Sequence, residues 1–150
     1  IVIASSAPPI MYPDCYGIDM SNLHGFVAFK AAIALLADQG RESLLGEVEA
    51  LCRAQDHLPD DKLVNHVQRV YEPFTDAELS AKVAEIVRPP DVPWTGQLDV
   101  IFQSLDGLHA AMPKHTGDWY FSGVYPTPGG LRVLNRSYLL WREGNDARAY

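Results

Sequence analysis

The feature that most constrains the fold is the continuous apolar run at the beginning of the sequence, Ile1 to Ala4, most of which is β-branched. A Ser-Ser pair at 5–6 and a Pro-Pro pair at 8–9 follow it, and both are typical of a loop. A short apolar run that ends in a loop is typical of a strand buried on both faces of a parallel sheet. The sequence therefore predicts an α/β fold with a buried strand over residues 1–5.

Four segments between residues 26 and 88 carry apolar side chains at helical spacing. Gly40 predicts a cap at the end of the first segment, and Cys52 lies on the apolar face of the second. Thr75 and Glu78 have the spacing of a capping box, which predicts the start of the fourth. We expect a largely helical unit, off the sheet, whose helices cover residues 26–40, 44–52, 59–71 and 75–88.

The rest of the chain predicts a second buried strand and three shorter elements. The pattern of residues 99–103 predicts the strand. We expect residues 1–5 to pair in parallel with it or with a strand that lies beside it. The other expectations are a short helix over residues 104–112, a strand or extended loop over 119–125, a turn over 126–130 and a terminal helix over 131–143.

Composition excludes several classes of function. The net charge of −7 and the scattered Lys and Arg residues argue against nucleic acid and against an anionic membrane surface. No apolar run reaches the roughly 20 residues that a membrane helix needs. Cys15 and Cys52 are too few for a disulfide framework or a zinc site, which predicts a reduced, cytoplasmic setting.

A search for motifs that carry chemistry finds no phosphate-binding glycine loop, no HExxH and no CxxC. The five histidines lack metal-ligand spacing and read as surface or capping residues, although His24 could pair with Asp19. The carboxyl ends of parallel strands face the ligand crevice, so Ser5 and Ser6 are the first polar groups expected near a site. The alternative is that these two serines only cap backbone groups of the loop.

Three segments resemble, in the right order, the amidophosphoribosyltransferases of purine synthesis. Residues 4–20 (ASSAPPIMYPDCYGIDM) resemble the stretch that follows the phosphoribosyl pyrophosphate (PRPP) loop of that family. Residues 100–108 (VIFQSLDGL) resemble a later strand and helix, and residues 121–126 (FSGVYP) resemble a closing element.

The resemblance implies part of a type I phosphoribosyltransferase sheet with a helical insert at about residues 26–88, the whole chain of residues 1–150 forming one C-terminal segment. In this family a glutaminase releases ammonia, which displaces pyrophosphate from PRPP to give phosphoribosylamine. The resemblance also assigns a crevice-lining role in substrate binding to Ser5, Ser6, Tyr16 and Asp19.

The residues that perform this chemistry are not in the sequence. The N-terminal nucleophilic cysteine and the paired-acid PRPP loop are both missing, so we expect no catalytic residue here and no activity from the isolated chain. The chain opens inside a strand, without Met or a signal peptide, which predicts that it continues a larger enzyme. The implied partners are the upstream glutaminase and PRPP-loop parts, which would use Mg²⁺; no cofactor is expected on this chain.

Many members of the family hold an iron–sulfur cluster on cysteines, three of them in the region that this chain resembles. Asp14, Gly117 and Tyr120 stand at those three positions. Cluster iron is held by thiolates, so the sequence predicts that no iron–sulfur cluster forms.

Two alternatives to an enzyme fragment stay open. The chain could be a non-catalytic binding or scaffold module derived from a phosphoribosyltransferase. An independent small enzyme would need a nucleophile–base pair, and the sequence does not reveal one. The unpaired edges of a truncated sheet can recruit partners, so association into homo-oligomers is also expected.

Overall fold

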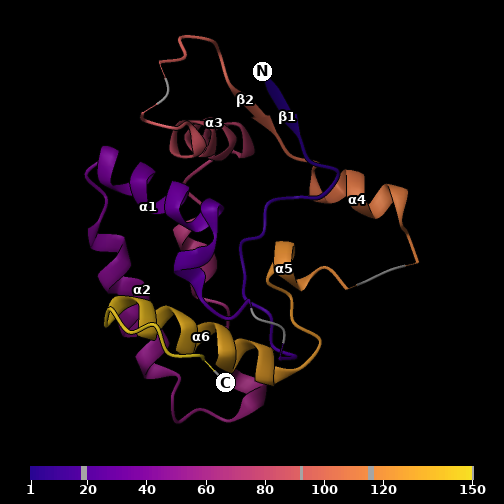
Figure 1. The fold of residues 1–150 in the computed structure, drawn as a ribbon. Coiled ribbons are helices and arrows are strands. Elements are labelled where there is room, and N and C mark those ends of the chain that lie inside the picture. Colours follow the sequence, from indigo (N-terminus) through magenta and orange to yellow (C-terminus); the bar gives the residue numbers. More distant parts are fainter. Residues whose placement is uncertain (18–19, 92, 115–116, 150) are drawn as a thin grey trace.

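The structure, a computed structural model, describes residues 1–17, 20–91, 93–114 and 117–149. Within these ranges the chain is mostly helical, and its strands form one parallel sheet beside the helices (Figure 1). The elements, in order, are β1 (Val2–Ala4), η1 (Leu23–Gly25), α1 (Val27–Asp38), α2 (Ser43–Ala54), η2 (Asp60–Lys62), η3 (Val67–Val70), α3 (Asp76–Val87), β2 (Asp99–Ile101), α4 (Leu105–Ala111), α5 (Trp119–Ser122) and α6 (Pro128–Arg142).

The sheet pairs the two segments that the sequence predicted to pair. β1 and β2 run parallel, and Ile3 lies opposite Val100 in the register. The ladder continues past β1, because the Ser5 amide donates to the Ile101 carbonyl at 2.8 Å. Residues opposite one another in a sheet point to the same face, so Ile3 and Val100 share one face. The predicted parallel pairing is confirmed.

The predicted burial of the two strands is wrong for this chain, since Ile101 of β2 is 55% exposed and β1 is exposed along its length. Val2 is 60% exposed and Ile3 is 48% exposed. The reason is that α3 packs against β2 and not against β1, so the helical layer reaches only the second strand (Figure 1). The fold is therefore a mixture of helices and a parallel sheet in which one strand lacks the cover that its apolar sequence suits.

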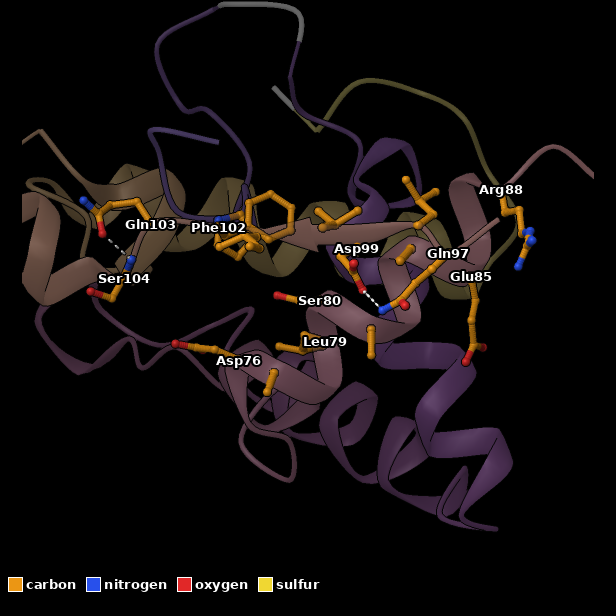
Figure 2. A pocket seen from close by; sticks show the side chains of 17 residues that line it. Asp76, Leu79, Ser80, Glu85, Arg88, Gln97, Asp99, Phe102, Gln103 and Ser104 are labelled. Atoms are coloured by element: carbon orange, nitrogen blue, oxygen red, sulfur yellow. Dashed lines mark hydrogen bonds between the residues drawn. The ribbon is translucent and has the colours of Figure 1, made fainter. Parts of the chain in front are cut away.

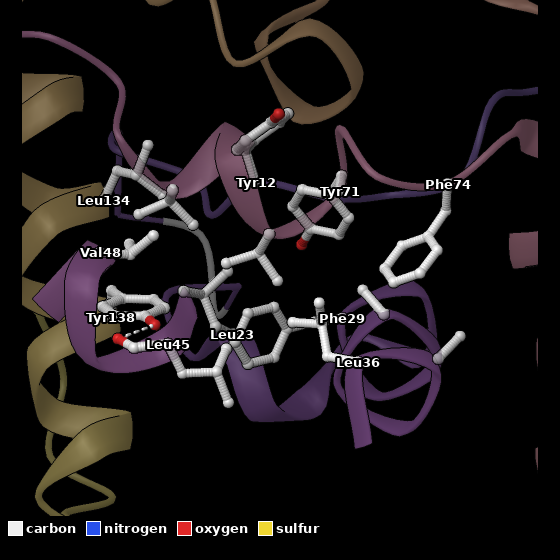
Figure 3. Close-up of a cluster of buried hydrophobic side chains, with 14 of the residues drawn as sticks. Tyr12, Leu23, Phe29, Leu36, Leu45, Val48, Tyr71, Phe74, Leu134 and Tyr138 are labelled. Atoms are coloured by element: carbon white, nitrogen blue, oxygen red, sulfur yellow. Dashed lines mark hydrogen bonds between the residues drawn. The ribbon is translucent and has the colours of Figure 1, made fainter. Parts of the chain in front are cut away.

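The hydrophobic core lies among the helices, where α1 packs against α3 and α2 packs against α6. Phe29 and Tyr138 meet edge to face there, with ring centroids 6.4 Å apart (Figure 3). Cys52 is fully buried in the same core, as its place on the apolar face of its helix predicted. Burying a side chain such as Leu36, which is inaccessible to solvent, contributes roughly 1.5–3 kcal/mol.

Local signals in the sequence placed several helix ends correctly. The Thr75 hydroxyl accepts from the Glu78 amide at 3.2 Å, and the Glu78 carboxylate accepts from the Thr75 amide at 2.8 Å. This capping box begins α3 as predicted. Gly40 has a φ of +65°, the left-handed conformation that favours glycine after a helix, here α1. Ser104 caps α4 by accepting from the Gly107 amide at 3.0 Å.

The predicted third helix, residues 59–71, is wrong. The chain forms two short 3-10 turns, η2 and η3, with an irregular segment between them. In that segment the Val64 amide donates to Oε1 of Gln55 at 2.6 Å, and Nε2 of Gln55 donates to the Val64 carbonyl at 3.0 Å. A side chain from the end of α2 thus takes the backbone groups that a helix would use.

The segment predicted as extended at residues 119–125 begins instead with the helical turn α5. It ends at Gly123, whose φ is +70° and where a Cβ would clash with Asn65. The predicted turn at 126–130 is shorter than expected, since α6 already begins at Pro128, a residue that suits the first turn of a helix.

Candidate functional site at the carboxyl ends of the strands

Two hollows lie beside the strands, one at the carboxyl end of β1, where the sequence placed the crevice, and one along β2. One has a volume of about 400 Å³ and is lined by Ser5 and Phe121 among others. The other has a volume of about 870 Å³ and lies between α3 and β2 (Figure 2). Pro9 and Phe102 line both hollows and so separate them.

Ser5 lies in this crevice and also caps its own loop. Its hydroxyl donates to the Ala7 carbonyl at 2.9 Å and accepts from the Ala7 amide at 3.2 Å. The two interpretations of Ser5 are therefore compatible, because a side chain that shapes the loop also lines the hollow that the loop encloses. Ser104, which follows β2, lines the larger hollow, and sequence reasoning did not single it out.

Two of the other predicted crevice residues, Ser6 and Tyr16, are not gathered beside Ser5. Ser6 is exposed and is not among the residues lining the 400 Å³ hollow. Tyr16 is 55% exposed, and its ring packs edge to face on Trp119 at 5.3 Å. Asp19 lies outside the described residues, as does the predicted pairing of His24 with it. Among the described residues, His24 Nε2 lies 3.6 Å from a carboxylate oxygen of Asp146.

The loop after β1 is fastened by tyrosine hydroxyls from later parts of the chain. Its Asp14 is fully buried and accepts the Tyr16 amide on Oδ2 at 2.8 Å. Three phenols donate to the loop: Tyr71 to the Met11 carbonyl at 2.6 Å, Tyr125 to the Pro13 carbonyl at 2.8 Å, and Tyr120 to Oδ1 of Asp14 at 2.9 Å. Met11, Pro13 and Asp14 of the first segment that carries the family resemblance are therefore bonded to residues remote from it in sequence.

These phenols remain protonated donors at neutral pH. The pKa of Tyr120 is raised to about 12. Burial is the largest cause, and the hydrogen bond to Asp14 and the negative charge of that residue add to it. Burial is also the main cause that raises the pKa of Tyr125. Sequence reasoning noted Asp14 and Tyr120 only as replacements for cysteine, because the contact between them spans more than a hundred residues.

A second polar group lies beside α4 and α5. His109 Nε2 is 2.7 Å from Oδ2 of Asp118, and the Ser122 hydroxyl donates to Oδ1 of Asp118 at 3.0 Å. All three residues line a hollow of about 760 Å³. The Asp118 carboxylate lies between the Ser122 hydroxyl and the His109 imidazole. A catalytic nucleophile would donate its hydrogen bond directly to its base, so this arrangement is not a nucleophile–base pair. The His109–Asp118 pair was not predicted, since the histidine read as a surface residue.

In the part of the chain that the structure describes, no three or more His, Cys, Asp or Glu side chains gather in the way that a metal ion would require. Asp60, at the start of η2, accepts from Nε of Arg132 at 2.8 Å. None of the described helices combines the length and apolar character of a membrane span.

Comparison of the chain with protein-family models, curated proteins and solved structures finds no match.

Proposed function

We propose that this chain is the C-terminal part of an amidophosphoribosyltransferase. In the proposed reaction, ammonia released from glutamine displaces pyrophosphate from PRPP and gives phosphoribosylamine. The chain would form a wall of the substrate crevice around Ser5, whereas the upstream glutaminase and PRPP-loop parts would carry the chemistry. On this proposal no residue of the chain is a catalytic residue, and the isolated chain is inactive.

The observation that carries the proposal is the contact between Asp14 and Tyr120. The resemblance aligns both positions with cysteines that hold one iron–sulfur cluster in other members of the family. Ligands of one cluster must be neighbours in space, so the resemblance requires positions 14 and 120 to be close. The 2.9 Å hydrogen bond between their side chains, across 106 positions, meets that requirement.

The exposed first strand supports the same proposal. A sheet of two strands is marginal in water, and β1 presents Val2 and Ile3 to solvent. A type I phosphoribosyltransferase sheet has further parallel strands, and on this proposal they would pair with the free edge of β1. Their helices would then cover the face that α3 leaves open.

The two metal groups of the family fit this chain poorly. Mg²⁺ would supply charge neutralisation on the pyrophosphate of PRPP, but the described residues offer no gathered ligand set, so we assign its ligands to the upstream loop. For an iron–sulfur cluster, Asp14 and Tyr120 offer a carboxylate and a phenol bonded to one another where the cluster would need thiolates. We derive no step through either group.

The test is an assay of the gene product that contains this chain. With PRPP, Mg²⁺ and glutamine it should release pyrophosphate, and ammonia in place of glutamine should also support the release. Reactions without PRPP provide the blank, and the ammonia reaction separates a glutaminase failure from a transferase failure. If a folded gene product releases no pyrophosphate with either nitrogen source, the proposal is wrong.

A binding or scaffold module is the second candidate. It is favoured by the open groove beside β2, which could accept a partner without any catalysis. The two candidates differ in the assay above, because a scaffold module would fold and bind a partner while its gene product shows no PRPP-dependent release.

A further inference from the structure

The larger hollow is a groove that follows the whole length of β2. Every residue from Gln97 to Ser104 lines it, although alternate residues of a strand point to opposite faces. The residues that point away from α3 line the groove through their backbone atoms or around the edge of the strand, and α3 forms the opposite wall (Figure 2).

The backbone of β2 has hydrogen-bonding groups directed into this groove. The Asp99 amide donates to the Ile1 carbonyl at 2.9 Å, and the Ile101 carbonyl accepts from the Ser5 amide at 2.8 Å. In a parallel pair alternate residues bond to the same neighbour, so the amide and carbonyl of Val100 point to the opposite edge. No third strand stands beyond that edge among the residues that the structure describes. An edge of this kind is a template for another strand.

The wall formed by α3 leaves room for such a strand. The helix turns short side chains toward the groove, at Ala77, Ser80, Ala81 and Ala84. Leu79 adds apolar surface from the same helix, and Val100 adds it from the strand. A groove between an edge strand and a helix suits an extended peptide, whose backbone bonds to the strand while alternate side chains contact the helix.

The charges of the groove select the chemistry of the occupant. Its lining carries three carboxylates, Asp76, Glu85 and Asp99, against the guanidinium of Arg88. That guanidinium is already engaged, since it donates to the Gly96 carbonyl at 2.8 Å and lies over the Trp94 ring. Glu85 is also engaged, in an ion pair with Lys82, and Asp76 and Asp99 leave the groove acidic, as is the chain, whose net charge is −7. A second copy would bring the same carboxylates and the same negative charge, which disfavours it as the occupant.

We propose that the groove between α3 and β2 binds an extended segment of a partner protein as a third strand, with apolar and basic residues in alternation. Residues opposite one another share a face, so a partner residue level with Val100 points toward α3 and should be apolar. A partner residue level with Asp99 points to the outer face, where Lys or Arg would meet the carboxylate. This site does not depend on the reaction proposed above.

The probe is a fluorescein-labelled peptide of alternating Val and Lys, titrated with the chain and followed by fluorescence anisotropy. We expect saturable binding of one peptide per chain, and a peptide of alternating Val and Glu should bind roughly tenfold more weakly or worse because of like charges. Amide hydrogen exchange should slow at Val100 and Phe102 when the Val–Lys peptide is bound, since a third strand would take up their amides.

Two variants test the groove. Val100→Pro removes the outward amide and keeps the bonds to β1, so it should weaken peptide binding roughly tenfold. Ala81→Arg should abolish binding, because the long side chain fills the groove and its positive charge repels a basic peptide. This variant still tests the proposal if Val100→Pro fails to fold. Ile86→Arg is the matched control, because Ile86 is an exposed residue of the same helix that does not line the groove; it should bind like the wild type.

Three results would overturn the proposal. One is the absence of saturable binding of the Val–Lys peptide. Another is binding that Ala81→Arg and Ile86→Arg leave equally strong. The last is a chain that sediments as a dimer and becomes monomeric in Ala81→Arg, which would identify a second copy as the occupant.

Discussion

The hydroxyl of Tyr120 donates a 2.9 Å hydrogen bond to Oδ1 of the fully buried Asp14, and the two residues are 106 positions apart. The bond joins α5 to the loop that follows β1. The same loop takes two backbone bonds from this region, since the amides of Met11 and Tyr12 donate to the Tyr120 carbonyl at 2.9 and 3.0 Å. One residue thus ties the beginning of the chain to its last third through both side chain and backbone.

Replacing Tyr120 with Phe should therefore destabilise the fold. The change leaves Oδ1 of Asp14 without this donor in a buried site, which costs about 1–3 kcal/mol of unfolding free energy. Urea unfolding measures the change. Tyr16→Phe is the matched control, because Tyr16 is 55% exposed and removing its hydroxyl should change the unfolding free energy by less than about 0.5 kcal/mol. Equal losses in both variants would contradict the structural role of Tyr120.

The contribution of the Tyr120 hydroxyl should depend on alkaline pH. Its pKa is raised from 10.0 to about 12, mainly by burial and then by Asp14. Because the folded value is the higher one, the stabilisation is fully present below about pH 10 and is lost as the pH rises through 12. The difference in unfolding free energy between wild type and Tyr120→Phe should stay constant near neutral pH and shrink above pH 10. A difference that grows over that range would refute this assignment.

The two cysteines should differ in reactivity. Burial raises the pKa of Cys52 to about 12, and its thiol is inaccessible in the core. Cys15 is only partly buried, although burial and then the charge of Asp14 raise its pKa too. A thiol reagent should modify Cys15 first and should reach Cys52 only after denaturation, since the exposed thiolate is the reactive form. In Cys15→Ala the fast phase should disappear, and if it persists, Cys52 is more accessible than the fold implies.

Val2→Asp should have a small effect on stability. The apolar run alone suggested a loss of several kcal/mol, but Val2 is 60% exposed and lies opposite Asp99 in the sheet. Only the repulsion between like charges remains, which amounts to a few tenths to about 1 kcal/mol. Val2→Lys is the matched variant and should be at least as stable as the wild type, because it places a cation opposite Asp99. A loss of several kcal/mol in both variants would mean that β1 is covered in solution.

Protein purified without oxygen should be colourless and free of stoichiometric iron. The positions that would supply thiolates hold Asp14, Gly117 and Tyr120. Iron analysis provides the measurement, and a content of about four atoms per chain would refute the expectation. Adding iron and sulfide under reducing conditions gives a stricter version, in which the chain should still fail to develop the absorption of a cluster.

The sequence by itself determined the local features of the fold. The capping box at Thr75, the cap at Gly40 and the helical character of α1, α2 and α3 were all predictable. Each depends on contacts between residues a few positions apart, which any isolated stretch of sequence contains. The parallel pairing of the two strands was also predictable, because two apolar β-branched runs have few other ways to satisfy their backbones.

Only the tertiary structure decided which surfaces are covered and which side chains meet. The apolar run at Val2 implied burial, but burial depends on where α3 lies, and that helix reaches only β2. The third helix gave way to 3-10 turns because Gln55, outside that segment, takes the backbone groups of Val64. The contact of Asp14 with Tyr120 and the groove beside β2 arise in the same way. Each is created by segments remote in sequence, whose approach no local pattern of residues records.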